Sequence, residues 1–383
     1  MTDFIPFAAP DIGEEEISSV VETLRSGWIT TGPKARQFEQ EFGRYLGGDV
    51  ECVAVNSATA GLHLALEALE VGPGDEVIVP TYTFTATAEV VRYLGADPRL
   101  VDADPRTYCL SLDAVESAIN SRTRAIVPVH FGGLACDMTR LVAIAAKHNL
   151  HIVEDAAHAF PTRWDGRLIG SLDTDAAVFS FYANKTLATG EGGMIVTRSA
   201  AVARRARVMR LHGIDRDAFE RFRSTKPAWY YEVVAPGFKY NLTDIAAAIG
   251  LAQLSKVDRF LARRTQLASR YLDALAGLPL VLPPRPRDAS ATHAWHLFVV
   301  ALPEPAPGRR DRLVQRLAEH GIGTSVHYIP LHMHPYWRDY YKLRPEAFPV
   351  ASDLAQRVVS LPLHTKLTDV EQDRIIAVLQ GAL

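Results

Sequence analysis

Residues 180–196 read SFYANKTLATGEGGMIV and place a lysine between two apolar segments. AVFSF at 177–181 is typical of a buried strand, and MIV at 194–196 begins another. Lys185 follows the first segment, and the glycine-rich turn GEGG at 190–193 precedes the second. Because lysines are rarely found inside proteins, this position indicates an amine that the fold holds inward.

Short apolar runs alternate with helical patterns through the first two thirds of the chain. This alternation predicts an α/β fold with a mostly parallel sheet that helices cover on both faces. Ligands of such sheets bind beyond the carboxyl ends of the strands, so the residues after each run are the site candidates. The runs are CVAV (52–55), EVIVP (76–80), RLVDAD (99–104), RAIVPVH (124–130) and LHIVEDA (150–156).

The last third of the chain has a different pattern. HAWHLFVVAL (293–302) and IGTSVHYIP (322–330) are expected to be strands, with RRDRLVQRLAEHG as a helix between them. We predict a large domain over residues 1–255 and a smaller α+β domain over 256–383. Segment 1–30 is a candidate to pack with the smaller domain.

Composition excludes several classes of protein. The 383 residues carry a formal net charge of -3, which gives no reason to expect nucleic acid or an anionic membrane as partner. Cys52, Cys109 and Cys136 are too scattered for a disulfide framework or a CxxC metal site. The start MTDFIPFAAP lacks signal-peptide features, and no run approaches the roughly 20 apolar residues that span a bilayer. We therefore expect a cytoplasmic protein.

Two strand ends offer groups that suit a planar phosphorylated ligand. Ser57, Ala58 and Thr59 open a helix, where free N–H groups and the helix dipole bind phosphate. Phe84 follows another strand and could stack on a flat ring. Taken alone, each segment is better explained by a structural role: simple helix capping for residues 57–59 and core packing for Phe84.

HIVEDAAHAF places two carboxylates at the end of an apolar strand. Such a position is costly unless a cation or several donors meet the charge. Asp155 and Glu154 are therefore candidates for a functional carboxylate, with His158 one turn later. The alternative is a helix N-cap with an incidental histidine.

Lys185 does not fit a P-loop, whose lysine follows its glycines. It suits a Schiff-base lysine, because partial burial lowers an amine pKa and makes it nucleophilic. Pyridoxal phosphate chemistry requires such a lysine, a carboxylate for the pyridine nitrogen and an anion site. Lys185, Asp155 and residues 57–59 provide this set at strand ends.

The chain resembles the DegT/DnrJ/EryC1/StrS family of sugar aminotransferases, which have the aspartate aminotransferase architecture (fold type I). Within the family it is most similar to enzymes that aminate C4 of 4-keto sugars, such as the UDP-4-amino-4-deoxy-L-arabinose and perosamine types. The matching segments are SGWITTGPK (26–34), NSATAGLHLAL (56–66), GDEVIVPTYTFTAT (74–87), IVEDAAHA (152–159), SFYANKTLATGEGGMIVT (180–197) and GFKYNLTDIAAAIGLAQL (237–254).

The resemblance implies a role for each matching residue. Lys185 would carry the cofactor pyridoxal 5'-phosphate and Asp155 would pair with its pyridine nitrogen. In addition, Ser57, Ala58, Thr59 and Ser180 would hold the phosphate, Phe84 and His158 would flank the ring, and Lys239 or Asn241 would reach the phosphate of a partner subunit. The candidates for the substrate are Trp28, Thr30, Thr31, Tyr182, Tyr240, His327 and Tyr328.

The implied reaction transfers an amino group from L-glutamate to a nucleotide-linked keto sugar, with 2-oxoglutarate as by-product. Its product would be an amino sugar for polysaccharide, lipopolysaccharide or glycoconjugate synthesis, and the enzyme would be a homodimer with shared sites. The alternatives are a sugar dehydratase, a C3 aminotransferase, or an inactive sensor of nucleotide sugars. A zinc site at His327, His332 and His334 lacks the supporting ligand spacing, and a sugar-binding rim explains these histidines better. A reactive thiol at Cys136 lacks an activating neighbour, and a packing role explains it better.

Overall fold

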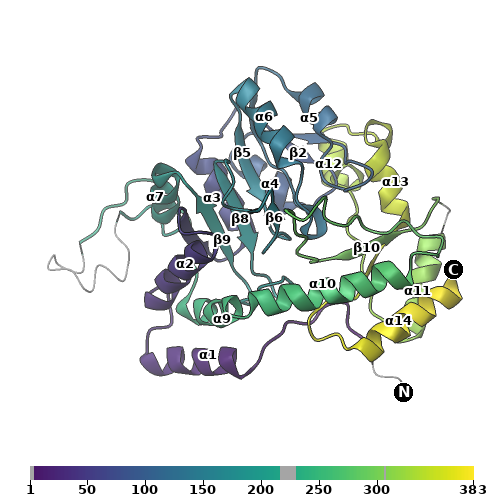
Figure 1. Cartoon of the computed structure of the whole chain (residues 1–383). Helices are drawn as coiled ribbons and strands as arrows, with labels where there is room; N and C mark the ends of the chain where they lie inside the picture. The colour runs from purple at the N-terminus through teal and green to yellow at the C-terminus, as the bar shows by residue number, and fades with distance from the viewer. Residues whose placement is uncertain (1–3, 216–229, 306–307) are drawn as a thin grey trace.

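The computed structural model describes residues 4–215, 230–305 and 308–383 (Figure 1). Its centre is a seven-stranded sheet in the order β1-β9-β8-β5-β4-β2-β3. Strands β3, β2, β4, β5 and β8 are parallel, whereas β9 runs antiparallel to both β8 and β1. The predicted mostly parallel α/β sheet is therefore confirmed. The strands are β1 (Glu51–Val55), β2 (Glu76–Pro80), β3 (Asp97–Val101), β4 (Thr123–Ile126), β5 (His151–Asp155), β8 (Ala176–Ser180) and β9 (Gly193–Thr197).

Helices cover both faces of this sheet. Alternate residues of β1 show why: Val53 and Val55 belong to the buried cluster on the side of α3 and α7, while Cys52 and Ala54 belong to the cluster on the side of α2. Buried apolar side chains thus fill the space on each side of the strands. The helices are α1 (Glu14–Ser26), α2 (Pro33–Tyr45), α3 (Ala58–Ala68), α4 (Ala86–Tyr93), α5 (Leu112–Ala118), α6 (Met138–His148), α7 (Ala200–Met209), α9 (Asp244–Leu254) and α10 (Val257–Ala274).

The last third has a core of its own around the antiparallel pair β10 and β11. The predicted helix between the two expected strands is confirmed as α11. The division of the chain at residue 255 stays a prediction. The elements of the last third are β10 (Phe298–Ala301), α11 (Arg309–Glu319), α12 (Pro335–Tyr340), α13 (Pro349–Arg357), β11 (Val358–Leu361) and α14 (Asp369–Ala382), with 3₁₀ turns at Leu331–Met333 and Pro345–Ala347. Earlier in the chain lie a 3₁₀ turn at Phe131–Gly133 and a small hairpin of β6 (Arg163–Trp164) and β7 (Arg167–Leu168).

The strand expected over residues 322–330 is wrong. In the structure this segment makes only isolated bridges, Ile322 to Ile5 and Ser325 to Ser360. Pro330 has no N–H to donate to a ladder, and His327 and Tyr328 turn toward a cavity instead of lying along a sheet. The side chains that look like the end of a strand therefore belong to a site wall.

The N-terminal segment connects distant parts of the chain (Figure 1). Ile5 donates from its N–H to Gly321 O, and its own carbonyl accepts from the Gly323 N–H, both at 2.8 Å. Farther along, α1 packs beside α9, and Ser19 Oγ donates to Ala248 O at 3.2 Å. None of the helices in the described residues is long and apolar enough to cross a bilayer.

Candidate active site

The strand ends of the sheet surround a cavity of about 520 Å³. All predicted cofactor-binding residues except Lys239 and Asn241 line it, as do three of the predicted substrate residues. A set that is scattered over most of the sequence therefore meets at one place, although the role of each residue stays a prediction. The predicted residues on the lining are Ser57, Ala58, Thr59, Phe84, Asp155, His158, Ser180, Tyr182, Lys185, His327 and Tyr328.

Lys185 lies in the loop that leaves β8 and reaches this cavity. Its N–H donates to Tyr182 O at 2.9 Å, and a bridge between Tyr182 and Gly190 closes the loop. Burial lowers the pKa of the Lys185 amine to about 8, while the Asp155 carboxylate acts in the opposite direction. A substantial fraction of the amine is therefore neutral near physiological pH and can act as a nucleophile or base.

Asp155 ends β5, the strand beside β8. One carboxylate oxygen accepts from Thr87 Oγ1 at 2.8 Å and the other from the Ala157 N–H at 3.2 Å. Burial raises the pKa of Asp155, and these two donors oppose that rise. The side chain is fixed in orientation and is poised to hold a cationic ring nitrogen.

Glu154 points to the other side of the sheet, because successive strand residues alternate between its faces. Its fully buried carboxylate accepts from Thr174 Oγ1 at 2.6 Å and contacts His130 Nε2 at 2.9 Å. It is absent from the described lining of the cavity. The structure thus separates Asp155, the carboxylate that the sequence analysis assigns to the site, from its neighbour Glu154.

The glycines of the GEGG turn bring β9 against the start of α3. A Cβ on Gly193 would lie 2.8 Å from the backbone of Ser57 and Ala58, so only glycine fits there. Gly190 has a φ of 85°, in the left-handed region that favours glycine. Ser57 caps α3 by accepting from the Ala60 N–H at 3.1 Å, which leaves the first N–H groups of the helix for an anion.

Several residues of the lining are not named as site candidates in the sequence analysis. Glu191 and Asn184 lie beside predicted residues and could have been found by their nearness to Lys185. His296 comes from the last third of the chain, and nothing local marks it as a site residue. The lining also includes Leu62, Thr83, Ala86, Val129, Ala157 and Gly192.

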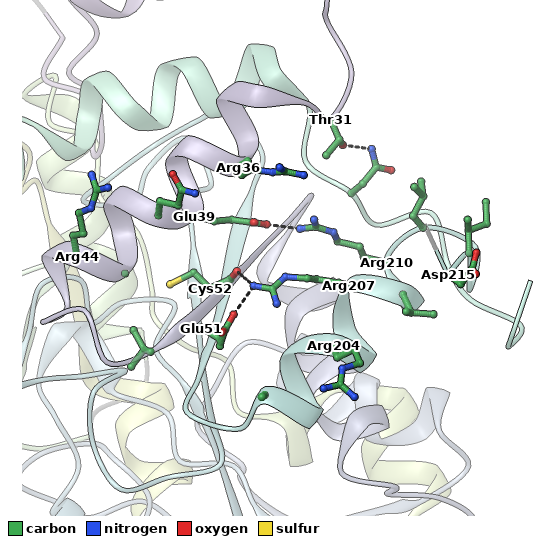
Figure 2. Close-up of a pocket in the computed structure, with 18 of the residues that line it drawn as sticks. Thr31, Arg36, Glu39, Arg44, Glu51, Cys52, Arg204, Arg207, Arg210 and Asp215 are labelled. Atoms are coloured by element: carbon green, nitrogen blue, oxygen red, sulfur yellow. Dashed lines mark hydrogen bonds and ion pairs between the residues drawn. The ribbon is translucent and has the colours of Figure 1, made fainter. Parts of the chain in front are cut away.

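The remaining predicted residues lie elsewhere. Thr31 and Asn241 line a second cavity of about 850 Å³, shown in Figure 2, where Asn241 Nδ2 donates to Thr31 Oγ1 at 2.6 Å. Arginines dominate this cavity, but Arg207 pairs with Glu51 at 2.7 Å and Arg210 with Glu39 at 2.5 Å. Trp28, Thr30, Lys239 and Tyr240 line neither of the two cavities within the described residues.

The structure disfavours the two side hypotheses. His332 is fully buried between Thr81 Oγ1 and Ser352 Oγ at 2.9 Å each, so its nitrogens are already occupied. No metal-suited group of three His, Cys, Asp or Glu side chains occurs in the described part of the chain. Burial raises the pKa of the Cys136 thiol well above its usual range, which opposes formation of a reactive thiolate.

The lining fits pyridoxal phosphate. Its aldehyde needs an amine, its pyridine nitrogen a carboxylate and its phosphate a set of donors. Lys185, Asp155 and the start of α3 supply these groups around one cavity. Asn184 Oδ1 and His296 Nδ1 are buried on the same lining without a hydrogen-bond partner in the described structure. Unpartnered buried polar atoms are rare, and these are expected of a site that is completed by a ligand.

Comparisons with known proteins agree with this geometry. The chain is 45% identical to the spore coat polysaccharide biosynthesis protein SpsC of Bacillus subtilis (strain 168), over 97% of this chain and 95% of that protein. It superposes with a TM-score of 0.93 on the PMP form of Spr1654 from Streptococcus pneumoniae, a putative sugar aminotransferase, at 36% identity and over 99% and 98% of the two chains.

A second solved structure gives the same result. DesV of S. venezuelae, in complex with a ketimine intermediate, is 36% identical with a TM-score of 0.87, over 99% of each chain. Residues 10–380 match the DegT/DnrJ/EryC1/StrS aminotransferase family. The chain therefore belongs to this family and is a pyridoxal phosphate-dependent aminotransferase.

Proposed function

We propose that the enzyme transfers the amino group of L-glutamate to C4 of a nucleotide-linked keto sugar. The observation that carries this proposal is the cavity that joins the Lys185 amine, the Asp155 carboxylate and the start of α3. The names of its relatives support the sugar part, because SpsC is a polysaccharide biosynthesis protein and Spr1654 a putative sugar aminotransferase.

The chain's own residues have defined tasks in such a transfer. Bound pyridoxal phosphate supplies the aldehyde and the electron sink. Lys185 Nζ would move a proton from the α-carbon of the amino donor to the cofactor, and in the second half-reaction it would move a proton from the cofactor to the sugar carbon that receives the nitrogen. Asp155 keeps the ring nitrogen protonated throughout. Because the donor and the sugar both react next to Lys185, they use the cavity in turn.

The alternatives fit these residues less well. By family resemblance, the dehydratases carry histidine in place of the lysine, and here Lys185 lies in the cavity with a lowered pKa. A sensor without activity has no use for a lysine and a carboxylate that are both oriented and both perturbed in pKa. Amination at C3 of the sugar would use the same residues, so only an experiment on the product distinguishes it from amination at C4.

We also infer a homodimer in which each site takes residues from two subunits. Lys239 and Asn241 lie outside the Lys185 cavity of their own chain, although the family resemblance assigns them to a phosphate site. Close to them lies an aromatic group on the surface: Phe238 and Tyr240 are stacked at 5.0 Å, and His63 contacts both Tyr240 and Tyr93. Tyr93 is 57% exposed, as expected of a ring that a second copy covers.

The test is amination of a panel of UDP-, GDP- and dTDP-linked keto sugars with L-glutamate, followed by mass spectrometry. We expect the mass of one sugar to change by the amount that corresponds to replacement of its keto group by an amino group. One molecule of 2-oxoglutarate should form for each amino sugar. Lys185→Ala is the matched control and should give neither. If glutamate is converted to 2-oxoglutarate once per site but no sugar is aminated, the sugar assignment is wrong and the cofactor chemistry stands. A cytoplasmic location is part of the proposal, since nucleotide sugars are its substrates.

A further inference from the structure

His158 has a fixed arrangement of its ring hydrogen. The Gly132 N–H points at His158 Nδ1 at 3.3 Å, and a backbone N–H can only donate. His158 Nδ1 must therefore be the acceptor nitrogen. Burial and the nearby Lys185 hold the pKa of His158 well below its usual range, so the ring is neutral. A neutral imidazole carries one hydrogen, which here must be on Nε2.

This assignment determines the direction of the next hydrogen bond. His158 Nε2 lies 3.0 Å from Tyr328 Oη, and it must donate to that oxygen. The phenolic hydrogen of Tyr328 is then left over. Among the described residues it has no other acceptor, and Tyr328 lines the cavity. The chain Gly132, His158, Tyr328 thus ends in a hydrogen that is available to a ligand.

The charges around the cavity indicate which ligand needs that hydrogen. Of the described residues on the lining, Lys185 is the only lysine or arginine, and the reaction itself uses its amine. Asp155 and Glu191 are acidic. An amino donor with two carboxylates therefore finds no lysine or arginine other than Lys185 on the described lining, so neutral donors of this chain are needed beside any group that a second subunit supplies.

His296 provides an independent sign that a polar ligand approaches here. Its ring centroid lies 4.4 Å from that of His158, and its Nδ1 is buried without a partner. The backbone beside His296 is held in place, because Arg264 Nη1 donates to Trp295 O at 3.0 Å and to Leu363 O at 2.9 Å. His296 Nδ1, which has no hydrogen-bond partner in the described structure, therefore belongs to a well-anchored part of the cavity wall.

We propose that Tyr328 is the hydrogen-bond donor to a carboxylate of the amino donor, and that His158 is the positioning residue that fixes its direction. The proposal rests on the proposed function and deepens it, since it names the group that recognises the amino donor. It assigns Tyr328 to the dicarboxylate substrate rather than to the keto sugar. It also gives the cavity a means of binding an acid although no arginine occurs among the described residues of its lining.

The test is titration calorimetry of the holoenzyme with maleate, a dicarboxylate that has no amino group to transfer. Tyr328→Phe should weaken maleate binding roughly 10-fold or more, as the loss of a hydrogen bond to a charged group does. The KM for the keto sugar should change little. Tyr45→Phe is the control, because Tyr45 Oη donates to Asp258 away from the cavity and its loss should leave maleate affinity unchanged.

A second pair of variants tests the positioning role and does not depend on the tyrosine substitution. In His158→Gln the amide can still accept from Gly132 and donate to Tyr328, so maleate affinity should stay within about 3-fold of wild type. His158→Leu removes both bonds and should weaken maleate binding as strongly as Tyr328→Phe. Equal effects of Gln and Leu would overturn the directional argument.

Other outcomes also overturn the proposal. Unchanged maleate affinity in Tyr328→Phe with a raised KM for the keto sugar would assign Tyr328 to the sugar. Unchanged affinity with a shifted cofactor absorption band would assign it to the cofactor. If the wild-type enzyme bound neither maleate nor 2-oxoglutarate, the hypothesis that the amino donor is a dicarboxylate would be wrong. The panel of keto sugars tests the proposed sugar substrate separately.

Discussion

Asp155, at the end of β5, and Lys185, in the loop after the adjacent strand β8, face one cavity, and each affects the pKa of the other. The Asp155 carboxylate raises the pKa of the amine, and the Lys185 ammonium lowers the pKa of the carboxyl. Burial acts against both charges and is the larger effect for each. Burial thus brings the pKa values of the amine and the carboxyl closer together, which lowers the free energy needed to move a proton at this site.

Lys185→Met should remove the cofactor absorbance and stabilise the cofactor-free protein at pH 7. The pKa of Lys185 is about 8 when folded and about 10.4 when unfolded, so the unfolded chain binds more protons between these values. Stability of the wild type rises with pH through this window, and the full penalty applies below pH 8. The variant should gain up to roughly 3 kcal/mol in urea unfolding at pH 7. Lys147→Met, at an exposed lysine, is the control, and a less stable Lys185→Met protein would contradict the account.

Asp155→Asn should retain cofactor binding and slow the half-reaction with glutamate on the order of 100-fold, because an amide cannot stabilise a protonated ring nitrogen. Glu154→Gln is the matched variant on the same strand. It should keep a rate within a few-fold of wild type and lose stability instead, since it disturbs the buried contacts with His130 and Thr174. Stopped-flow absorbance and thermal unfolding measure the two effects. The opposite pattern would move the function to Glu154.

Gly193→Ala should weaken cofactor affinity at least about 10-fold, because the added methyl group displaces the start of α3. Gly190→Ala introduces left-handed strain of about 1 kcal/mol but meets no atom within 4 Å. It should therefore lower stability more than affinity. Gly381→Ala, with open space around its Cβ, is the neutral control. Fluorescence titration with pyridoxal phosphate distinguishes the three, and equal affinities would show that the helix start is not the phosphate site.

Mixed dimers should regain activity from two inactive variants. Lys185→Ala chains lack the amine, and Lys239→Ala/Asn241→Ala chains lack the groups assigned to the partner's site. In a mixed dimer with shared sites, one site holds both defects and the other holds neither. Activity near half of the wild type per mixed dimer is expected after co-refolding and tag-based purification. Mixed dimers that form and stay inactive would refute shared sites.

The sequence predicts the local part of the site well. Apolar runs locate the strands, and the polar residues at or after their ends, Asp155 and Lys185 above all, lie where the rule for parallel sheets expects. The glycine-rich turn is explained only by the structure, since the atoms that Gly193 meets are distant in sequence. The local sequence pattern therefore predicts where a strand ends, but only tertiary packing shows which residues lie next to Gly193.

The rest depends on how the last third of the chain folds back. His296 reaches the cavity from a segment that reads as a strand, and residues 322–330 resemble a strand because Ile322 and Val326 are apolar. Periodicity cannot distinguish an apolar residue on a ladder from one on a site wall. The direction of the Gly132, His158 and Tyr328 hydrogen bonds likewise follows from three distant segments.

The pairing of Ile5 with Gly321 and Gly323 has a consequence for biosynthesis. Ile5 is synthesised long before Gly321 and Gly323, because most of the sequence lies between them. These two hydrogen bonds can therefore form only after all seven strands of the central sheet have been synthesised. His327 and Tyr328, which line the Lys185 cavity, follow shortly after Gly323 in the chain. The lining of this cavity is thus complete only after the residues that pair with Ile5 have been made.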